Sequence, residues 1–152
     1  MVGEKRSGLT TEIAMSATAF HHFQVTVTDI EKSRAFYGGF LGLPEMPRPE
    51  FPFDGAWFQL ANGQELHIVR VPNPIWRPPA AMDIFETHIA LRVGSFRGAV
   101  EKLHAAGFHE DLPDHHPLKI VIKPHPPTGY PQVYFFDPDR HLIEWNAATL
   151  DS

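Results

Sequence analysis

The stretch HFQVTVTDIEKSRAFYGGF, residues 22–40, decides the fold. Its first part alternates the apolar residues Phe23, Val25 and Val27 with polar ones, which is the period of a strand with one buried face. Asp29 is placed to cap a helix that runs from Ile30 to about Phe40. The stretch therefore predicts a strand that leads directly into a helix.

Two further apolar runs complete a unit with the strand and helix. Residues 56–60 and 66–71 flank Asn62-Gly63, which is a strong signal for a hairpin turn. The order strand, helix and then further strands predicts a βαβββ unit that begins near Phe20.

The same order of elements returns in the second half of the chain. Residues 87–93 alternate again, Ser95 can cap a helix that runs to Ala106, and Gly107 can end it. Residues 133–136 and 142–145 predict a closing hairpin around the turn-forming residues 137–140. The spacing from Phe58 to His67 equals that from Phe135 to Glu144, nine residues in each case. His67 and Glu144 therefore hold equivalent places in a repeat.

The repeat gives a domain division. We expect an N-terminal arm over residues 1–19, one domain over 20–147 and a tail over 148–152. Within the domain, the first module spans about 20–72, a proline-rich connector spans 73–83, and the second module spans about 84–147. The second module is longer because of residues 112–131, which contain six prolines and predict a loop over one end of the sheet.

Composition excludes several classes of function. A chain of 152 residues with a net charge of -5 offers no basic stripe for nucleic acid. It has no apolar run of about 18 residues to cross a membrane, and residues 1–19 lack the apolar region of a secretory signal. The absence of cysteine excludes disulfides and thiolate sites. We expect a cytoplasmic protein in which any metal ion is bound by histidine and carboxylate.

Strand periodicity selects four candidate ligands among the ten histidines and the acidic residues. Side chains alternate across a strand, so the apolar positions fix the face of each polar residue. The four residues opposite the apolar sets of their strands are His22, His67, His88 and Glu144. With helices covering the apolar faces, they can converge on a polar concave face and hold one divalent ion, which is zinc, nickel, cobalt, manganese or iron. None of the other seven histidines is selected, and solvated roles are expected for five of them, His104, His109, His115, His116 and His141.

The sequence resembles the vicinal oxygen chelate superfamily, which contains glyoxalases, bleomycin-resistance proteins and extradiol dioxygenases. The residues that carry the resemblance are 22–29, 33–37, 65–67, 87–91, 134–138 and 143–144. It implies an α+β fold in which two paired βαβββ modules form a cupped, partly open mixed β-barrel with the helices outside. The likeness is greatest to glyoxalase-like proteins of uncharacterised activity. Glyoxalase I relatives usually hold Glu or Gln at the place of His67, and the family prefers Gly at Arg140, where this chain must avoid a positive φ or carry a strained arginine.

The resemblance and the ligand set together predict a metal-dependent lyase or isomerase. A small oxygenated substrate would chelate the metal, with Glu144 as the base and Tyr134 as a second candidate catalytic residue. Arg92, Gln24 and Asn146 share the faces of the ligands and are candidates for orienting the substrate.

Two alternatives stay open. A ferrous dioxygenase would use His22, His88 and Glu144 as a facial triad. Residues from His125 to Glu144 nearly fit the extradiol signature, and an odd-length hairpin loop would bring Tyr134 to the face of Glu144. A sequestering protein without chemistry would stack its ligand on Trp57, Trp76 and residues 134–136. A homodimer is also possible, with Trp76 and the connector as its interface.

Overall fold

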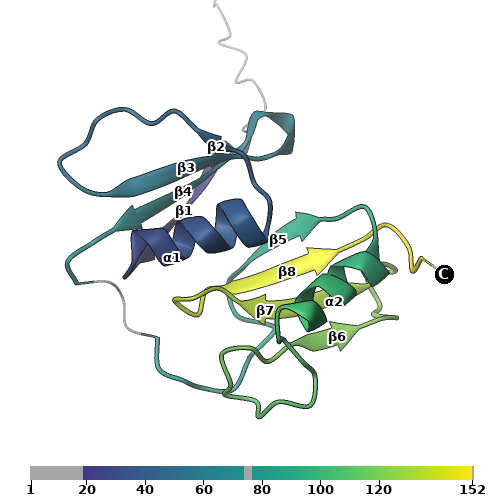
Figure 1. The fold of residues 1–152 in the computed structure, drawn as a ribbon. Helices are drawn as coiled ribbons and strands as arrows, with labels where there is room; N and C mark the ends of the chain where they lie inside the picture. The colour runs from purple at the N-terminus through teal and green to yellow at the C-terminus, as the bar shows by residue number, and fades with distance from the viewer. Residues whose placement is uncertain (1–18, 74–76, 152) are drawn as a thin grey trace, which may run out of the picture.

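The chain folds into two four-stranded mixed sheets, each accompanied by one helix (Figure 1). The computed structural model describes residues 19–73 and 77–151, so Trp76 and the first 18 residues lie outside the described residues. The α+β class and the two βαβββ modules are confirmed. The strands form two open sheets and do not close into a barrel. No helix in the described ranges has the length and apolar character needed to cross a membrane.

The first module contains β1 (His22–Val27), α1 (Ile30–Arg34), β2 (Glu45–Met46), β3 (Gly55–Gln59) and β4 (Glu65–Arg70). α1 continues as a π-helical segment, η1 (Ala35–Phe40), and a short 3-10 turn, η2 (Ala61–Gly63), joins β3 to β4. The strand order is β1-β4-β3-β2, with β1 parallel to β4 and the other pairs antiparallel.

The second module repeats this arrangement with β5 (His88–Arg92), α2 (Phe96–Ala105), β6 (Val121–Lys123), β7 (Gln132–Phe136) and β8 (Leu142–Asn146). Its strand order is β5-β8-β7-β6, and β5 is parallel to β8 as β1 is to β4. Residues 112–131 are not the single loop that their six prolines predict. Three of these residues form β6, which pairs antiparallel with β7 because the run Ile120 to Ile122 offers a short apolar edge strand between the prolines.

The predicted helix starts and turns are present. The Asp29 carboxylate accepts hydrogen bonds from two backbone N–H groups of α1, and the Ser95 hydroxyl accepts one from Gly98. Asn62 and Gly63 have φ of 61° and 76°, so the first hairpin uses the left-handed backbone that this dipeptide favours. Arg140 has φ of 66°, and the second turn therefore carries the strained arginine.

Both sheets turn their apolar faces to one shared core. η1 lies between them: Phe36 and Phe40 contact Phe135 and Trp145 of the second sheet, while Tyr37 packs on Phe58 of the first. The Tyr37 hydroxyl also donates to the buried Asp137 carboxylate across the module boundary, at 2.7 Å. Because the core takes up the apolar faces, the polar face of each sheet lies on the side away from that core.

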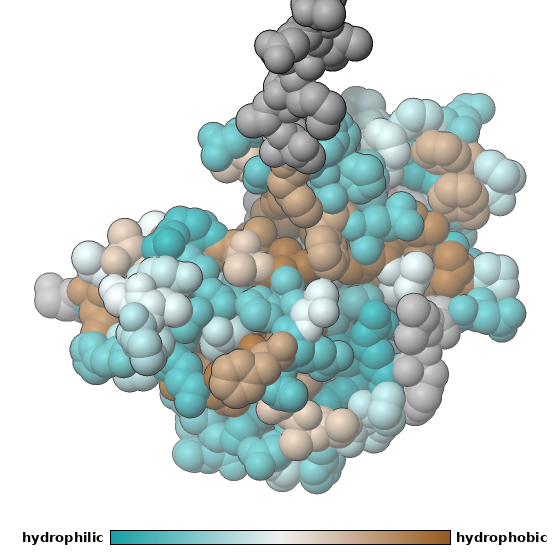
Figure 2. All heavy atoms as spheres, turned by 180° about the vertical axis from the view of Figure 1, so that it is seen from behind, coloured by the Kyte–Doolittle hydropathy of each residue, from teal (hydrophilic) through white to brown (hydrophobic). Residues whose placement is uncertain are grey.

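Hydrophobic side chains also gather in a band across the middle of the molecule when it is seen from behind (Figure 2). A groove of about 750 Å³ lies between the modules there, and its lining includes Phe23, Leu60, Leu91 and Trp145. The edge strands β1 and β5 both contribute to this groove.

Candidate metal centre

The first half-site consists of His22 and His67, which come from the parallel strands β1 and β4. Gln24 is the register partner of His67, so His22 is its diagonal neighbour on the same face. The two imidazole rings stack, with centroids 4.5 Å apart and an interplanar angle of 14°. Adjacent parallel strands therefore bring this predicted pair together, as the alternation of residues 22–27 requires.

His67 is the more rigid member of this half-site. Its other ring face stacks on Trp57, its cross-strand partner on β3, at a centroid distance of 4.1 Å. Its Nε2 lies 2.7 Å from the Glu65 carboxylate. His67 is buried, whereas His22 is exposed and contacts His21 through Nδ1 at 2.9 Å. One imidazole is thus fixed by packing, and the other can reorient in solvent.

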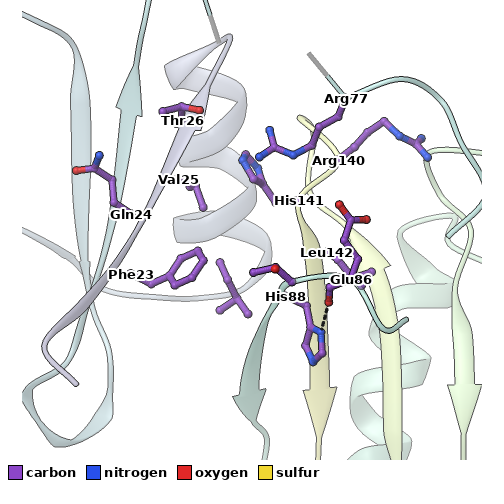
Figure 3. Close-up of a pocket in the computed structure, with 12 residues that line it drawn as sticks. Phe23, Gln24, Val25, Thr26, Arg77, Glu86, His88, Arg140, His141 and Leu142 are labelled. Carbon is purple, nitrogen blue, oxygen red and sulfur yellow. Dashed lines mark hydrogen bonds between the residues drawn. The ribbon is translucent and has the colours of Figure 1, made fainter. Parts of the chain in front are cut away.

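The second half-site consists of His88 and Glu144, from the parallel strands β5 and β8. The His88 Nε2 lies 3.3 Å from a Glu144 carboxylate oxygen. The His88 Nδ1 lies 2.7 Å from the backbone carbonyl of Glu86, as Figure 3 shows. A carbonyl only accepts hydrogen bonds, so Nδ1 carries a proton and donates it. In a neutral His88 the Nε2 lone pair then faces the carboxylate, which is the arrangement of a metal-ligating histidine held by an outer carbonyl.

Glu144 lies at the centre of a buried hydrogen-bond network. Asn146 Nδ2 donates to it at 2.6 Å, and Gln132 and Tyr134 hydrogen-bond to it as well. Burial by itself would raise the pKa of Glu144, but these hydrogen bonds and the charge of His88 outweigh burial and lower the pKa. The carboxylate is therefore ionised at neutral pH, which is the form that binds a cation.

Tyr134 lies on the same face of the sheet as Glu144. The two residues are direct partners in the β7–β8 ladder, because the loop between these strands has five residues, 137–141. The hairpin loop therefore has an odd number of residues, which is the condition under which Tyr134 was expected to share the face of Glu144. Burial, together with the bond to Glu144, raises the pKa of the Tyr134 phenol, so this group is a hydrogen-bond donor at neutral pH.

A cavity of about 970 Å³ opens over the second half-site. Tyr134, Glu144 and Asn146 line it, together with His125 and other residues of the segment 123–130. Phe85 stands at the cavity with 91% of its surface exposed. The predicted loop segment over the sheet thus contributes a wall to this cavity.

The two half-sites do not meet within one chain. In residues 19–73 and 77–151, no three of the four predicted ligands have their ligand atoms within 4.8 Å of one another. Figure 3 shows why: Phe23 of β1 points towards the second module, whereas Gln24, on the face of His67, points away from it. The cavity in that view, of about 250 Å³, is lined by His88 but not by His22, His67 or Glu144.

The three residues predicted to orient the substrate lie in different places. Asn146 contacts Glu144 and lines the larger cavity. Arg92 lies over the ring of Tyr130, 4.9 Å from its centroid, and Gln24 lies beside the first half-site, on the strand next to His67.

Sequence reasoning missed Glu65 and Gln132 as partners of the ligands. Their positions in the sequence could have indicated this role. Glu65 lies two residues before His67, and Gln132 lies two residues before Tyr134, so each shares a strand face with a residue that had been selected. Sequence reasoning also did not predict that Trp57 packs on His67. The repeat makes Trp57 the equivalent of Tyr134, which is the cross-strand partner of Glu144.

The chain belongs to the Glyoxalase/Bleomycin resistance protein/Dioxygenase superfamily, whose model matches residues 19–145. Members of this superfamily typically use a divalent metal, and many are enzymes. The chain is 29% identical over 133 residues to the uncharacterised protein YwkD of Bacillus subtilis (strain 168), which covers 86% of this chain and 97% of that protein.

Solved structures show the same fold. A glyoxalase/dioxygenase from Nostoc punctiforme superposes with a TM-score of 0.64 at 24% identity, over 97% of this chain and 98% of that one. The fosfomycin resistance protein FosX from Listeria monocytogenes gives a TM-score of 0.61 at 21% identity, over 89% and 97%.

Proposed function

We propose that this protein is a divalent-metal-dependent lyase or isomerase that acts on a small oxygenated substrate able to chelate the metal. The candidate ligands are His22, His67, His88 and Glu144. Three neutral imidazoles and one carboxylate leave a divalent ion with a net positive charge, which attracts substrate oxygens.

The observation that carries the proposal is the pairing of His88 with Glu144. The Nε2 of His88 lies 3.3 Å from a carboxylate oxygen of Glu144, and the Nδ1 of His88 donates a hydrogen bond to the Glu86 carbonyl. A proton on Nε2 would make this contact an ion pair, and a metal ion that replaces this proton would be bound by both the Nε2 lone pair and the carboxylate. The lowered pKa of Glu144 keeps the carboxylate charged, so this half-site is suited to a metal ion.

The complete centre would form between two copies of the chain. Each copy carries one histidine pair and one histidine–glutamate pair on different faces, and a two-fold axis would place the first half-site of each copy over the second half-site of the other. Two identical centres would result. The apolar groove between the modules, lined by Phe23 and Leu91 among others, offers surface that a second copy would bury.

The residues around the cavity supply the remaining chemistry. A bound divalent ion would act as a Lewis acid on one or two substrate oxygens. Tyr134 is protonated at neutral pH and can donate to a substrate oxygen, and Asn146 can orient it. Glu144 is the candidate base, and it accepts a proton from the substrate only once it leaves the metal, because its pKa is low while it is bound in its network.

A ferrous dioxygenase is the second candidate, and one observation favours it. His125, Tyr134 and Glu144 line the same cavity, and Tyr134 lies on the face of Glu144. A dioxygenase would leave His67 outside the ligand set, so His67→Ala would retain iron while His88→Ala would lose it.

The sequestering alternative needs aromatic rings that are free to stack on a ligand. Trp57 is already stacked on His67, and Tyr134 and Phe136 are buried. These contacts favour catalysis over sequestration. Turnover of hemithioacetals or 2-oxo acids by the metal-loaded protein tests the reaction class, and its absence with both would contradict that class while leaving the metal centre standing.

Mixing two inactive variants tests the shared centre most sharply. His22→Ala/His67→Ala and His88→Ala/Glu144→Ala each remove one half-site from every centre, so neither homodimer holds metal there. Mixed dimers would contain one centre with all four ligands and one with none. We expect bound cobalt, read by its visible absorption, to return on mixing.

A mixture that binds no more cobalt than its separate components would contradict the shared centre. Sedimentation of the wild-type chain as a monomer at all concentrations would contradict it independently.

A further inference from the structure

A second group of metal-ligand side chains lies at and just after the end of α2 and shares no residue with either half-site. His104, His109 and Glu110 form it, and we call it the α2 cluster. Their ligand atoms all lie within 4.8 Å of one another, and among the described residues only this group of three or more does so. The two imidazole rings stack at a centroid distance of 5.0 Å.

The backbone holds the three side chains together. His104 lies in the last turn of α2, where Gly107, with φ of 90°, reverses the chain. The Gly107 N–H donates to the His104 carbonyl at 2.9 Å. His109 then pairs with Lys119 in an isolated bridge that leads into β6. The cluster therefore joins the end of a helix to the start of an edge strand, on backbone that is already hydrogen-bonded.

The two separations that involve Glu110 bracket the value for a tetrahedral ion. The His104 Nε2 lies 2.7 Å and the His109 Nδ1 lies 3.7 Å from the same Glu110 oxygen. Ligands at about 2.0 Å from a tetrahedral zinc ion are about 3.3 Å apart, a value between these two. A shift of a few tenths of an ångström by exposed side chains would equalise them.

The charges around the cluster also favour a cation. The Glu110 carboxylate faces both imidazoles. The Asp111 carboxylate lies 3.5 Å from the His109 Nδ1. Lys119 is the nearby positive group, and its ammonium is occupied by the carbonyls of Glu110 and Leu112 and by Asp114.

We propose that the α2 cluster is a second divalent-metal site, for a borderline ion of the zinc, nickel or copper class. His104, His109 and Glu110 are its ligands, with Asp111 or water in the fourth position. The Asp111 N–H, which donates to His109 Nδ1 in this structure, would turn to solvent. The ion would fasten the end of α2 to the segment before β6. The proposal does not depend on the proposed function, since it uses none of the same residues.

Metal stoichiometry tests the site in the full-length chain. Protein stripped with a chelator is titrated with zinc chloride by calorimetry, and with cobalt chloride by visible absorption. We expect His104→Ala and Glu110→Gln each to remove one ion per chain or to weaken it by roughly tenfold or more. His115→Ala is the matched control, because His115 is an exposed histidine of the same module outside the cluster.

The same titration in a His88→Ala/Glu144→Gln chain separates the two sites. One ion per chain should still bind there, and His104→Ala added to that background should abolish it. In that same background, metal should raise the melting temperature of the His88→Ala/Glu144→Gln chain and of that chain with His115→Ala added, but not with His104→Ala added. Equal stoichiometry and equal thermal shifts in His104→Ala, Glu110→Gln and His115→Ala would overturn the proposal.

Discussion

The two half-sites come from equivalent strands of a repeat, yet their surroundings differ. In the second, Glu144 is buried and receives hydrogen bonds from three side chains, and the Glu86 carbonyl fixes the tautomer of His88. In the first, His67 is held by stacking and His22 is exposed. The second half-site is thus a buried, hydrogen-bonded carboxylate beside an oriented imidazole, whereas the first consists of two stacked imidazoles of which one is exposed. Sequence symmetry fixed the places of the four candidate ligands, and the neighbouring residues decided the electrostatic environment of each.

Glu144→Gln should have the largest effect, because it removes the one charged ligand and keeps the shape of the side chain. Zinc or cobalt affinity, measured by calorimetry, should fall by more than the roughly 10- to 100-fold that the loss of an outer partner of a metal ligand costs. Glu101→Gln, on the exposed face of α2, is the control. Unchanged affinity in Glu144→Gln would remove the second half-site from the metal centre.

Tyr134→Phe should have an intermediate effect. It removes the hydrogen bond to the Glu144 carboxylate, and bonds to charged groups contribute about 1.5–3 kcal/mol. We expect a loss of that order in the free energy of urea unfolding and a roughly tenfold loss of metal affinity. Trp57→Phe, at the equivalent position of the first module, should affect metal affinity less. A larger loss for Trp57→Phe would reverse the contrast between the half-sites.

The pH dependence of stability should distinguish Glu144 by its sign. Its folded-state pKa is below the ordinary value of 4.5, so the ionised form contributes stability that is fully present above that value. This contribution is lost as the pH falls through the folded-state pKa. The difference in unfolding free energy between the wild type and Glu144→Gln, measured with chelator present, should therefore shrink on acidification. A difference that widens below pH 4.5 would contradict the lowered pKa.

His22→Ala should have the smallest effect on stability. The side chain is exposed and its main contact is one stacked ring, so the unfolding free energy without metal should change by less than about 1 kcal/mol. Metal affinity should nevertheless fall, because a ligand is lost. A large loss of stability would show that the first half-site is as tightly built as the second.

Most of the fold followed from local patterns. The period-two runs at 22–27 and 88–92, the caps at Asp29 and Ser95 and the turn at Asn62-Gly63 each act over a few residues, so the sequence shows them directly. β2 and β6 were not visible in this way. They have two and three residues, too short for a period to register, and they exist because a neighbouring strand offers free hydrogen-bonding groups.

The candidate site could be predicted only in halves. Alternation placed each ligand on a polar face, and both pairs lie together within their own modules. Convergence of all four assumed that the two polar faces share one concavity within the chain. η1 prevents this arrangement, because Phe36, Tyr37 and Phe40 draw the apolar faces of both sheets into a common core.

The sequence by itself determined the repeat, the class of fold and the faces on which the histidines and Glu144 lie, because these depend on the period of a strand and on short-range turns. Tertiary structure decided three further properties. It set the distance between the half-sites, added hydrogen bonds from Gln132 and Tyr134 of β7 to the one that Glu144 receives from Asn146 of its own strand, and gathered the α2 cluster around the helix end. These properties depend on how separate elements pack, and packing energy is summed over contacts between residues that are far apart in the chain.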